Sequence, residues 1–233
     1  MSYASAEVLE TVKLPGMFEQ FWNLPEQWIE EPNARRKGVS GVVRTTLNQD
    51  VVYVKKQLNH LHYSLPYPMG RPTALREADA IATVRALGIN APEIIHCESR
   101  RIDGNYHTIL VTKALESFLA LDDFAAQVKN QDELDNYKLI RAVALTLAIL
   151  HSNRWQHSAL YAKHILVRKQ AGDYKVALID LEKMRRRLTF QQASLHDIDQ
   201  FSRHQTCWHQ MRWQQFLDEY QRALAAARRG RRV

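Results

Sequence analysis

The sequence predicts an α+β protein in which a small, strand-rich first part precedes a mostly helical second part. Residues 51–56 read Val-Val-Tyr-Val-Lys-Lys, a β-branched and aromatic run typical of a strand. A helical pattern with one apolar side follows over residues 74–87. From about residue 134 onwards, the apolar residues again recur at helical spacing. Strands with one helix, followed by a run of helices, indicate the α+β class.

The length and composition are those of a globular chain. Its 233 residues are 45% hydrophobic and 24% charged. We expect one domain over residues 1–233, with a β-rich lobe over about 1–113 and a helical lobe over about 114–233. The longest apolar run, Ala142–Leu150, is shorter than the roughly 20 residues that span a bilayer. Because the N-terminus also lacks a signal-peptide pattern, we expect a cytoplasmic protein.

The formal net charge of +7 favours acidic partners. Much of the excess comes from three clusters, Arg35–Lys37, Arg185–Arg187 and the arginines of 228–232. They are either solvated basic faces or contacts with anionic glycolipid or headgroups on the inner face of the inner membrane, where each cation contributes about 1 kcal/mol. Nucleic acid is the weaker partner class, since no nucleic-acid motif accompanies the charge.

Cys97 and Cys207 lie far apart and lack a CxxC spacing, so we expect reduced thiols in a reducing compartment. The segment from His204 through Cys207 to His209 has no fourth ligand at the usual spacing, which argues against zinc.

In the first half, the aromatic segment from Val8 to Glu31 predicts a leading helix or irregular segment. Gly38 and Gly41 lie among β-branched residues, which suits a hairpin whose backbone approaches a ligand; an ordinary hairpin is the alternative. Residues 66–72, with three prolines and one glycine, predict a loop.

Alternation along the strand puts Val51, Tyr53 and Lys55 on one face. Thr73 is the expected N-cap of the following helix, which Gly88 ends, and Glu77 falls in its first turn. The 22 positions between Lys55 and Glu77 are enough to bring the two side chains together. The alternative is a solvated lysine and a solvated glutamate.

Further strands are expected over 93–99 and 108–112, joined by a turn at Asp103–Gly104. The last helical region is expected over about 196–229, with a frayed basic tail.

The segment from His157 to Val167 matches the protein-kinase catalytic loop H-R-D-L-x-x-x-N in frame. His157 falls on the histidine, Leu160 on the leucine and His164 on the metal-binding asparagine. Ala159 falls on the catalytic aspartate. A second apolar run ends at Asp180.

These segments, in this order, resemble the lipopolysaccharide kinase (Kdo/WaaP) family, and most closely its InaA-like branch. The resemblance covers about residues 35–185. It implies a bilobal protein-kinase-like fold, with a β-rich N-lobe and a short helical C-lobe. It also implies phosphotransfer from ATP, with Mg²⁺, to a sugar of the lipopolysaccharide inner core.

The resemblance implies a role for each matching residue, because phosphoryl transfer needs positioning and positive charge around the phosphates. Lys55 would hold the α and β phosphates and Glu77 would orient Lys55. Asp180 would hold Mg²⁺ through carboxylate oxygen, with His164 at the second metal position or, alternatively, in the core. The backbone amides of Gly38, Ser40 and Gly41 would cover the phosphates.

His157 and Ala159 mark the catalytic-loop positions, although His157 and His151 suit a structural role in anchoring the loop. Glu182 either adds a carboxylate near the metal or pairs with a neighbouring cation. Loss of the base at Ala159 costs about 10²–10⁴ in rate. Two hypotheses therefore stay open: a slow or unconventional kinase, or a pseudokinase that binds nucleotide or a protein partner, with stress sensing as one setting.

Overall fold

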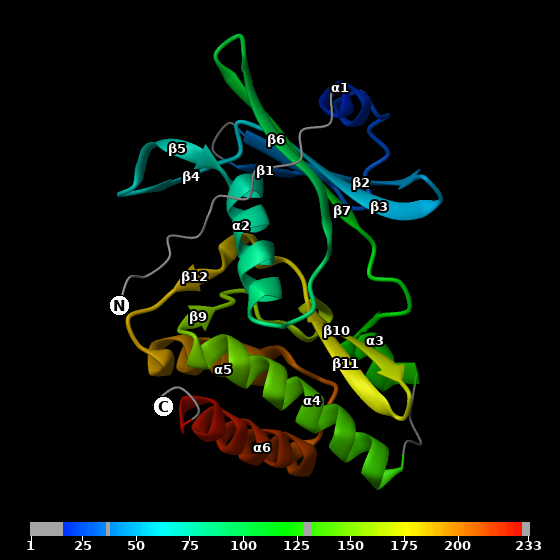
Figure 1. The fold of residues 1–233 in the computed structure, drawn as a ribbon, viewed down its shortest axis with the longest axis vertical. Helices are drawn as coiled ribbons and strands as arrows, with labels where there is room; N and C mark the ends of the chain where they lie inside the picture. Colours follow the sequence, from blue (N-terminus) through cyan, green and yellow to red (C-terminus); the bar gives the residue numbers. More distant parts are fainter. Residues whose placement is uncertain (1–15, 36–37, 128–131, 230–233) are drawn as a thin grey trace. The chain divides into compact units, whose positions relative to one another are not determined.

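The structure is a computed structural model that describes residues 16–35, 38–127 and 132–229 (Figure 1). The chain divides into two compact units. The first combines Met1–Asp79 with Glu93–Ala114, and the second combines Ala80–Pro92 with Leu115–Val233. The expected single domain and its lobe boundaries stay predictions.

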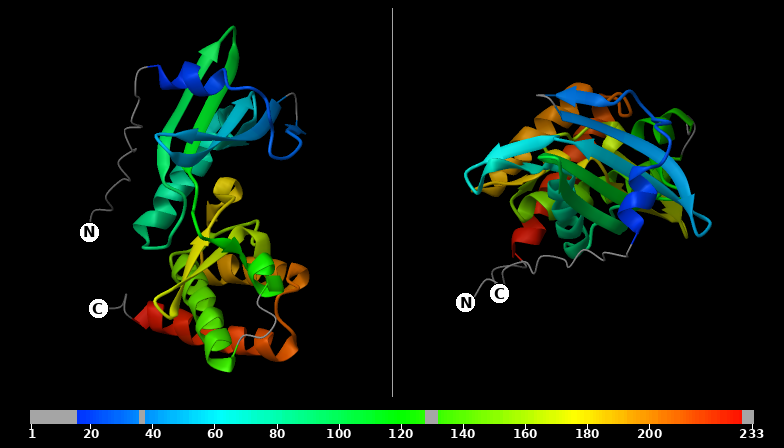
Figure 2. Two further views of the ribbon diagram at one scale, coloured as in Figure 1. Left: turned by 90° about the vertical axis from the view of Figure 1, so that its right-hand side faces the viewer. Right: turned by 90° about the horizontal axis from the view of Figure 1, so that it is seen from above.

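The first unit is built on a five-stranded antiparallel sheet in the order β1-β2-β3-β7-β6. A separate two-stranded hairpin, β4–β5, projects to one side of this sheet (Figures 1 and 2). The elements that begin in this unit are α1 (Met17–Trp22), β1 (Asn33–Arg35), β2 (Gly38–Leu47), β3 (Asp50–Leu58), β4 (Leu61–Ser64), β5 (Tyr67–Pro72), α2 (Thr73–Ala86), β6 (Ile94–Ile102) and β7 (Asn105–Lys113).

One face of the sheet packs against α1. The residues that form this buried cluster are Met17, Phe18, Phe21, Val52, Val54, Ile109 and Val111. Lys56 points to the same side, where its ammonium group lies 5.6 Å from the ring centre of Trp22 and 5.5 Å from that of Trp28, and donates to Leu24 O. Burial lowers the pKa of Lys56. The predicted alternation of β3 is therefore confirmed, since Lys55 lies on the opposite face.

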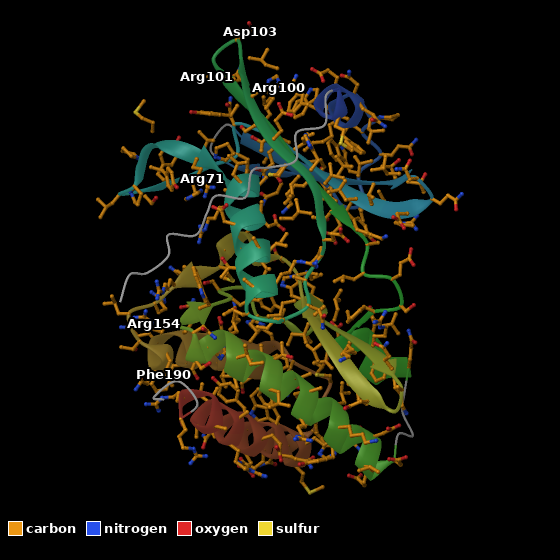
Figure 3. The ribbon with its side chains drawn as sticks, in the orientation of Figure 1. Arg71, Arg100, Arg101, Asp103, Arg154 and Phe190 are labelled. Carbon is orange, nitrogen blue, oxygen red and sulfur yellow. The ribbon has the colours of Figure 1, made fainter. Side chains whose placement is uncertain are left out.

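The hairpin expected at Asp103–Gly104 is confirmed, and β6 and β7 run longer than predicted. Both turn residues have positive φ, 48° and 79°, which suits a two-residue turn. Asp103 lies at the tip of this long ribbon (Figure 3).

The ordinary hairpin expected around Gly38 and Gly41 is present, because β2 pairs antiparallel with β1 and with β3. The loop expected over residues 66–72 is wrong. Residues 67–72 form β5, where Pro72 pairs with Leu61. A two-stranded hairpin tolerates proline because an edge strand has amides that need no partner strand.

The second unit is mostly helical. Helix α4 packs along α6, and small antiparallel ribbons β10–β11, β8–β10 and β9–β12 complete the unit. Its elements are β8 (Leu119–Ala120), α3 (Leu121–Gln127), α4 (Glu133–Ser152), β9 (Trp155–Gln156), η1 (Ala162–His164), β10 (Ile165–Gln170), β11 (Asp173–Leu178), η2 (Leu181–Lys183), β12 (Arg185–Arg186), α5 (Phe190–His204) and α6 (Gln210–Arg229).

Helix α4 begins where the sequence predicts, with Asp132 as its N-cap. The last helical region begins earlier than expected, because the Thr189 side chain accepts from Gln192 N and starts α5 there. Arg228 and Arg229, which were expected in a frayed tail, belong to α6, and Arg228 stacks on Phe190 at 4.0 Å from the ring centre. The remaining tail residues lie outside the described part of the chain.

Among the described residues, both cysteines are free, as expected. Burial raises the pKa of each thiol to about 12, which keeps Cys97 and Cys207 protonated. None of the helices in the described ranges is long and apolar enough to cross a membrane.

Candidate functional site

Lys55 and Glu77 form an ion pair inside the first unit. Lys55 extends from β3 toward α2, and Glu77 lies in the first turns of that helix. Only 17% of the Lys55 side chain and 11% of the Glu77 side chain are exposed. The proximity of the two side chains predicted from the sequence is thus present, while their role toward a nucleotide stays a prediction.

Gln57 holds the start of α2 against β3. Its side chain lies on the same face as that of Lys55, because the two positions are two residues apart. Gln57 Oε1 accepts from Ala74 N at 2.9 Å, and Gln57 Nε2 donates to Thr73 Oγ1 at 2.8 Å and to Ser40 Oγ at 3.1 Å. Strand β3 therefore contacts α2 twice. Gln57 contacts the N-terminus of the helix, and Lys55 contacts Glu77 one turn later.

This arrangement corrects the expected cap of α2. Thr73 is the first residue of the helix, and its hydroxyl contacts Gln57 and, at 2.8 Å, His60 Nδ1. Gln57 Oε1 caps the helix instead. Sequence reasoning missed Gln57, although it follows Lys55 on the same strand face.

Gly38 and Gly41 have neighbours within their own unit that explain the absence of a side chain. A Cβ on Gly41 would lie 2.4 Å from the ring of Trp28, and a Cβ on Gly38 would lie 2.3 Å from Asn59 O. Gly38, Gly41 and Ser40 all lie in β2, where their backbone pairs with neighbouring strands. These packing contacts explain the two glycines without a ligand. The contact of this segment with phosphates stays a prediction.

In the second unit, Asp197 of α5 fixes the segment that resembles a catalytic loop. Its carboxylate accepts from His157 N at 2.6 Å and from Ser158 N at 2.9 Å. His151 Nε2 lies 3.1 Å from the same carboxylate. Asp197 is completely buried. Burial opposes its ionisation, yet the bonds and charge of His151 and His157 outweigh that effect and lower the pKa of Asp197.

His157 is held by two backbone groups. Its Nε2 lies 3.0 Å from Ile179 O, and its Nδ1 accepts from Ala159 N at 3.3 Å. A carbonyl can only accept, so Nε2 carries the proton and Nδ1 is the acceptor. Burial lowers the pKa of His157 to about 4, so the ring is neutral at pH 7. These contacts favour the anchoring role that the sequence also suggested for His157.

His151 also has a structural environment. It is fully buried, and its Nδ1 lies 2.7 Å from the hydroxyl of Tyr220 on α6. His151 therefore links α4, α5 and α6 beneath the loop.

Ala159, His164 and Asp180 lie together beyond His157. His164 Nδ1 donates to Ala159 O at 2.7 Å and lies 3.5 Å from Asp180 Oδ2. Asp180 adopts left-handed φ and ψ of 56° and 52°, an uncommon conformation for a residue other than glycine. Its side chain is 40% exposed. The loop thus presents one accessible carboxylate next to a histidine with a fixed tautomer.

This pair fits a metal ion that is held mainly by a nucleotide. With Nδ1 bonded to a carbonyl, His164 keeps the Nε2 lone pair, as metal-binding histidines usually do. Among the described residues, no group of three or more His, Cys, Asp or Glu side chains is arranged to hold a metal. Mg²⁺ commonly takes one or two carboxylates, with phosphates and water as its other ligands. The Asp180 carboxylate suits that mode, with the His164 ring beside it.

The His204–His209 segment lies at the end of α5 and in the following turn. The His204 ring packs against Tyr161, with ring centres 5.2 Å apart, and Cys207 Sγ contacts Gln205 Oε1 at 3.5 Å.

Comparison with known proteins identifies the family of the chain. The model of the lipopolysaccharide kinase (Kdo/WaaP) family matches residues 19–220, which is most of the chain. The chain belongs to this family. It is 36% identical to Protein InaA of Escherichia coli strain K12 over 189 residues, covering 80% of this chain and 87% of that protein. The resemblance predicted from the sequence is confirmed.

A solved structure shares the fold of this lipopolysaccharide kinase family member. The structure titled WaaP in complex with acyl carrier protein matches with a TM-score of 0.65, over 94% of this chain and 96% of the other. At 19% identity, the match concerns the fold. It confirms the predicted α+β, kinase-like class.

Proposed function

We propose that the protein is an ATP-dependent phosphotransferase that acts on a sugar hydroxyl of an anionic envelope glycolipid. The observation that carries this proposal is the Lys55–Glu77 ion pair, which Gln57 and the capped start of α2 keep in place. A lysine oriented by a glutamate in this way suits the α and β phosphates of ATP. Family membership supports a kinase-type activity.

Under this proposal, residues of each unit have separate roles. Lys55 would contribute positive charge to the phosphates, and Asp180 with His164 would hold Mg²⁺. The metal would supply neutralisation of the charge that develops on the transferred phosphoryl group. The anchored His157 would keep the loop in one conformation, so that the acceptor hydroxyl meets a fixed backbone.

Ala159 supports a second candidate, a catalytically impaired member that binds nucleotide or a protein partner. It is 1% exposed, and its own side chain offers no acceptor for the hydroxyl proton. The hydroxyls of Ser158 and Tyr161 are poor bases, and each accepts a hydrogen bond, from Gln156 Nε2 at 2.8 Å and from Gln200 Nε2 at 3.1 Å respectively. The phosphotransferase proposal still holds because phosphoryl transfer depends mainly on positioning and charge, so a missing base slows the reaction without preventing it.

The first test is ATP binding, measured by thermal shift with and without Mg²⁺. We expect stabilisation of the native protein and a loss of affinity of about tenfold or more in Lys55→Ala. Lys113→Ala is the matched control, because it removes a lysine–carboxylate pair from the same sheet, on β7. No stabilisation by millimolar ATP would remove the phosphotransferase and the nucleotide-binding form of the second candidate, and would leave only a member that binds a protein partner.

The second test separates the two candidates. ATP-dependent labelling of lipopolysaccharide core acceptor is compared between the native protein and Lys55→Ala. Equal background rates, with ATP binding retained in the native protein, would refute phosphotransfer and favour the impaired member. A gain of activity in Ala159→Asp would show that the native loop lost its base without replacement.

A further inference from the structure

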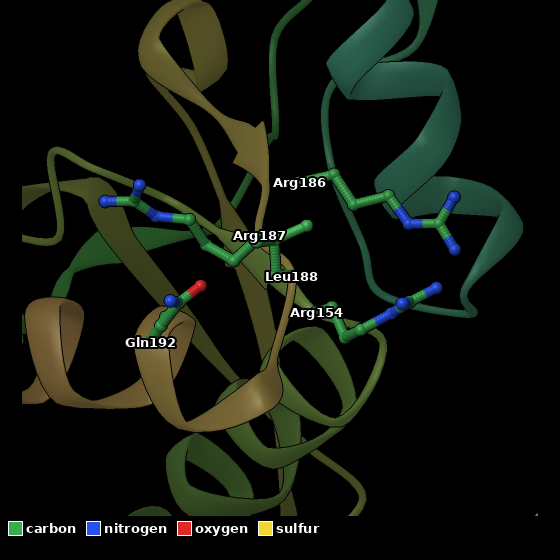
Figure 4. A pocket seen from close by; sticks show the side chains of 5 residues that line it. All are labelled: Arg154, Arg186, Arg187, Leu188 and Gln192. Carbon is green, nitrogen blue, oxygen red and sulfur yellow. The ribbon is translucent and has the colours of Figure 1, made fainter.

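Three arginines line a pocket of about 460 Å³ in the second unit (Figure 4). Its lining residues are Arg154, Arg186, Arg187, Leu188 and Gln192. Three of the five carry a positive charge that no pH in the physiological range removes. A pocket with this lining selects for anions.

Backbone pairing holds these arginines together. Arg186 is the cross-strand partner of Trp155 in the β9–β12 ribbon, and Arg187 N donates to Arg154 O at 2.7 Å. The guanidinium groups of Arg154 and Arg186 extend to the same side of the pocket, while Arg187 extends to the other, above Gln192 (Figure 4). Arg154 itself adopts a left-handed φ of 65°, which is uncommon for arginine. Pairing of the backbone thus places Arg154 and Arg186 on adjacent segments of the fold.

Carboxylates do not compensate this charge within the described ranges. Ion pairs in these ranges involve Arg71, Arg100, Arg203, Arg212 and Arg222, and Arg76 also has an interaction partner. Neither Arg154, Arg186 nor Arg187 is among them. Like charges held side by side repel, so an anion that binds between or beside the two guanidinium groups relieves this repulsion.

The pocket is also connected to the loop segment. Arg187 Nε donates to the fully buried Gln156 side chain, whose Nε2 donates to Ser158 Oγ at 2.8 Å. Arg185 Nε donates to the same hydroxyl at 3.1 Å. Ser158 directly precedes Ala159, the position that would face the acceptor hydroxyl. A ligand that contacts Arg187 would therefore be linked to Ser158 through this hydrogen-bond chain.

We propose that this pocket binds a phosphate group carried by the acceptor. Arginine forks match phosphate oxygens in pairs, which gives both charge and orientation. That the molecule bearing this phosphate is the acceptor rests on the proposed function. Phosphate binding by the pocket does not rest on it. The acceptor is then a glycolipid that already bears at least one phosphate beside the hydroxyl to be modified.

The test measures binding by calorimetry in the absence of nucleotide. The probes are a deacylated, phosphorylated lipopolysaccharide core oligosaccharide and the same oligosaccharide after removal of its phosphates. We expect the phosphorylated form to bind at least about tenfold more tightly, and the double variant Arg154→Gln, Arg186→Gln to lose this difference. Arg141→Gln on α4 is the matched control: it removes one exposed charge from the same unit and should keep the difference. The single variants Arg154→Gln and Arg186→Gln, checked by circular dichroism, replace the double variant if it misfolds.

Further measurements test which molecule supplies the phosphate and whether it binds at the arginines or at Lys55. Inorganic phosphate tests a free anion, and phosphatidylcholine vesicles with or without phosphatidylglycerol test a lipid headgroup. Loss of vesicle binding in the arginine variant, without oligosaccharide binding, would assign the pocket to membrane headgroups. A phosphate-dependent difference that persists in the arginine variant, or disappears only in Lys55→Ala, would overturn the proposal. Retained phosphate-dependent binding without phosphotransfer would refute the proposed function and leave the pocket assignment intact.

Discussion

Asp197 is the residue on which the conformation of the loop at residues 157–159 depends most directly. Its carboxylate accepts from two successive backbone amides, His157 N and Ser158 N, and contacts His151 Nε2. Asp197→Asn keeps the size of the side chain but replaces one oxygen with an NH₂ group. Whichever way the amide is oriented, that group meets at least one N–H donor in a completely buried site.

The cost of this change can be worked from these contacts. A hydrogen bond to a charged group contributes about 1.5–3 kcal/mol, and a buried donor left without an acceptor costs about 1–3 kcal/mol. The asparagine loses the charge at these three contacts and at a fourth, His196 Nδ1 at 3.3 Å from Oδ1, and leaves one or two donors unsatisfied. We therefore expect a decrease of about 3–5 kcal/mol in the free energy of unfolding, in the range known for broken buried charge networks. For a chain of this length, this corresponds to a decrease in Tm of roughly 6–20 °C.

Urea unfolding monitored by circular dichroism measures the loss. Asp199→Asn is the matched control, since it makes the same chemical change two residues away on α5, where Asp199 forms only a surface pair with Arg203. That variant should lose less than about 1 kcal/mol. If Asp197→Asn were no less stable than Asp199→Asn, Asp197 would not be the anchor of the loop, and the account of His157 given above would be wrong.

Three further predictions concern single contacts. Gly41→Ala should cost about 1–3 kcal/mol in urea unfolding because the new Cβ meets the Trp28 ring, and Trp28→Leu in the same chain should recover part of it. Gln57→Leu should speed hydrogen exchange at Ala74 N, since its acceptor is removed, and an unchanged rate would contradict the capping role. His157, whose folded pKa of about 4 lies below its ordinary 6.5, should contribute roughly 3 kcal/mol above pH 6.5 that is lost as pH falls toward 4. His157→Gln should flatten that part of the stability–pH curve, and an equally steep curve would refute the assignment.

The parts of the fold that the sequence predicts are those set by local patterns. Strand β3, the first turns of α2 and the start of α4 follow from the spacing of their apolar residues. The proximity of Lys55 and Glu77 was predictable because one strand, a connection and one helical turn fix the distance between them. Family motifs supplied the rest of the candidate site.

The features that sequence reasoning missed depend on contacts between distant residues. Gly41 suggested a ligand, but the neighbour that excludes a side chain there is Trp28, whose position depends on its antiparallel bridge to Val43 of β2. Asp197 looks like an ordinary helical carboxylate. Its one sequence signal is its place between Ala193 and Phe201, four residues from each, on the buried face of α5. A charge at such a position predicts a buried partner, although not which one.

The burial of Asp197 bears on the choice between the two candidate functions. An unpaired buried carboxylate is costly, and a paired one often contributes no more stability than a hydrophobic residue would. The physical benefit of Asp197 is therefore the fixed conformation of His157 and Ser158 rather than stability as such. That conformation is useful only if something binds against the loop, either an acceptor or a protein partner. Because the loop is held in place while Ala159 lacks a carboxylate, the Ala159→Asp variant tests the missing group alone, on a scaffold that is already ordered to receive it.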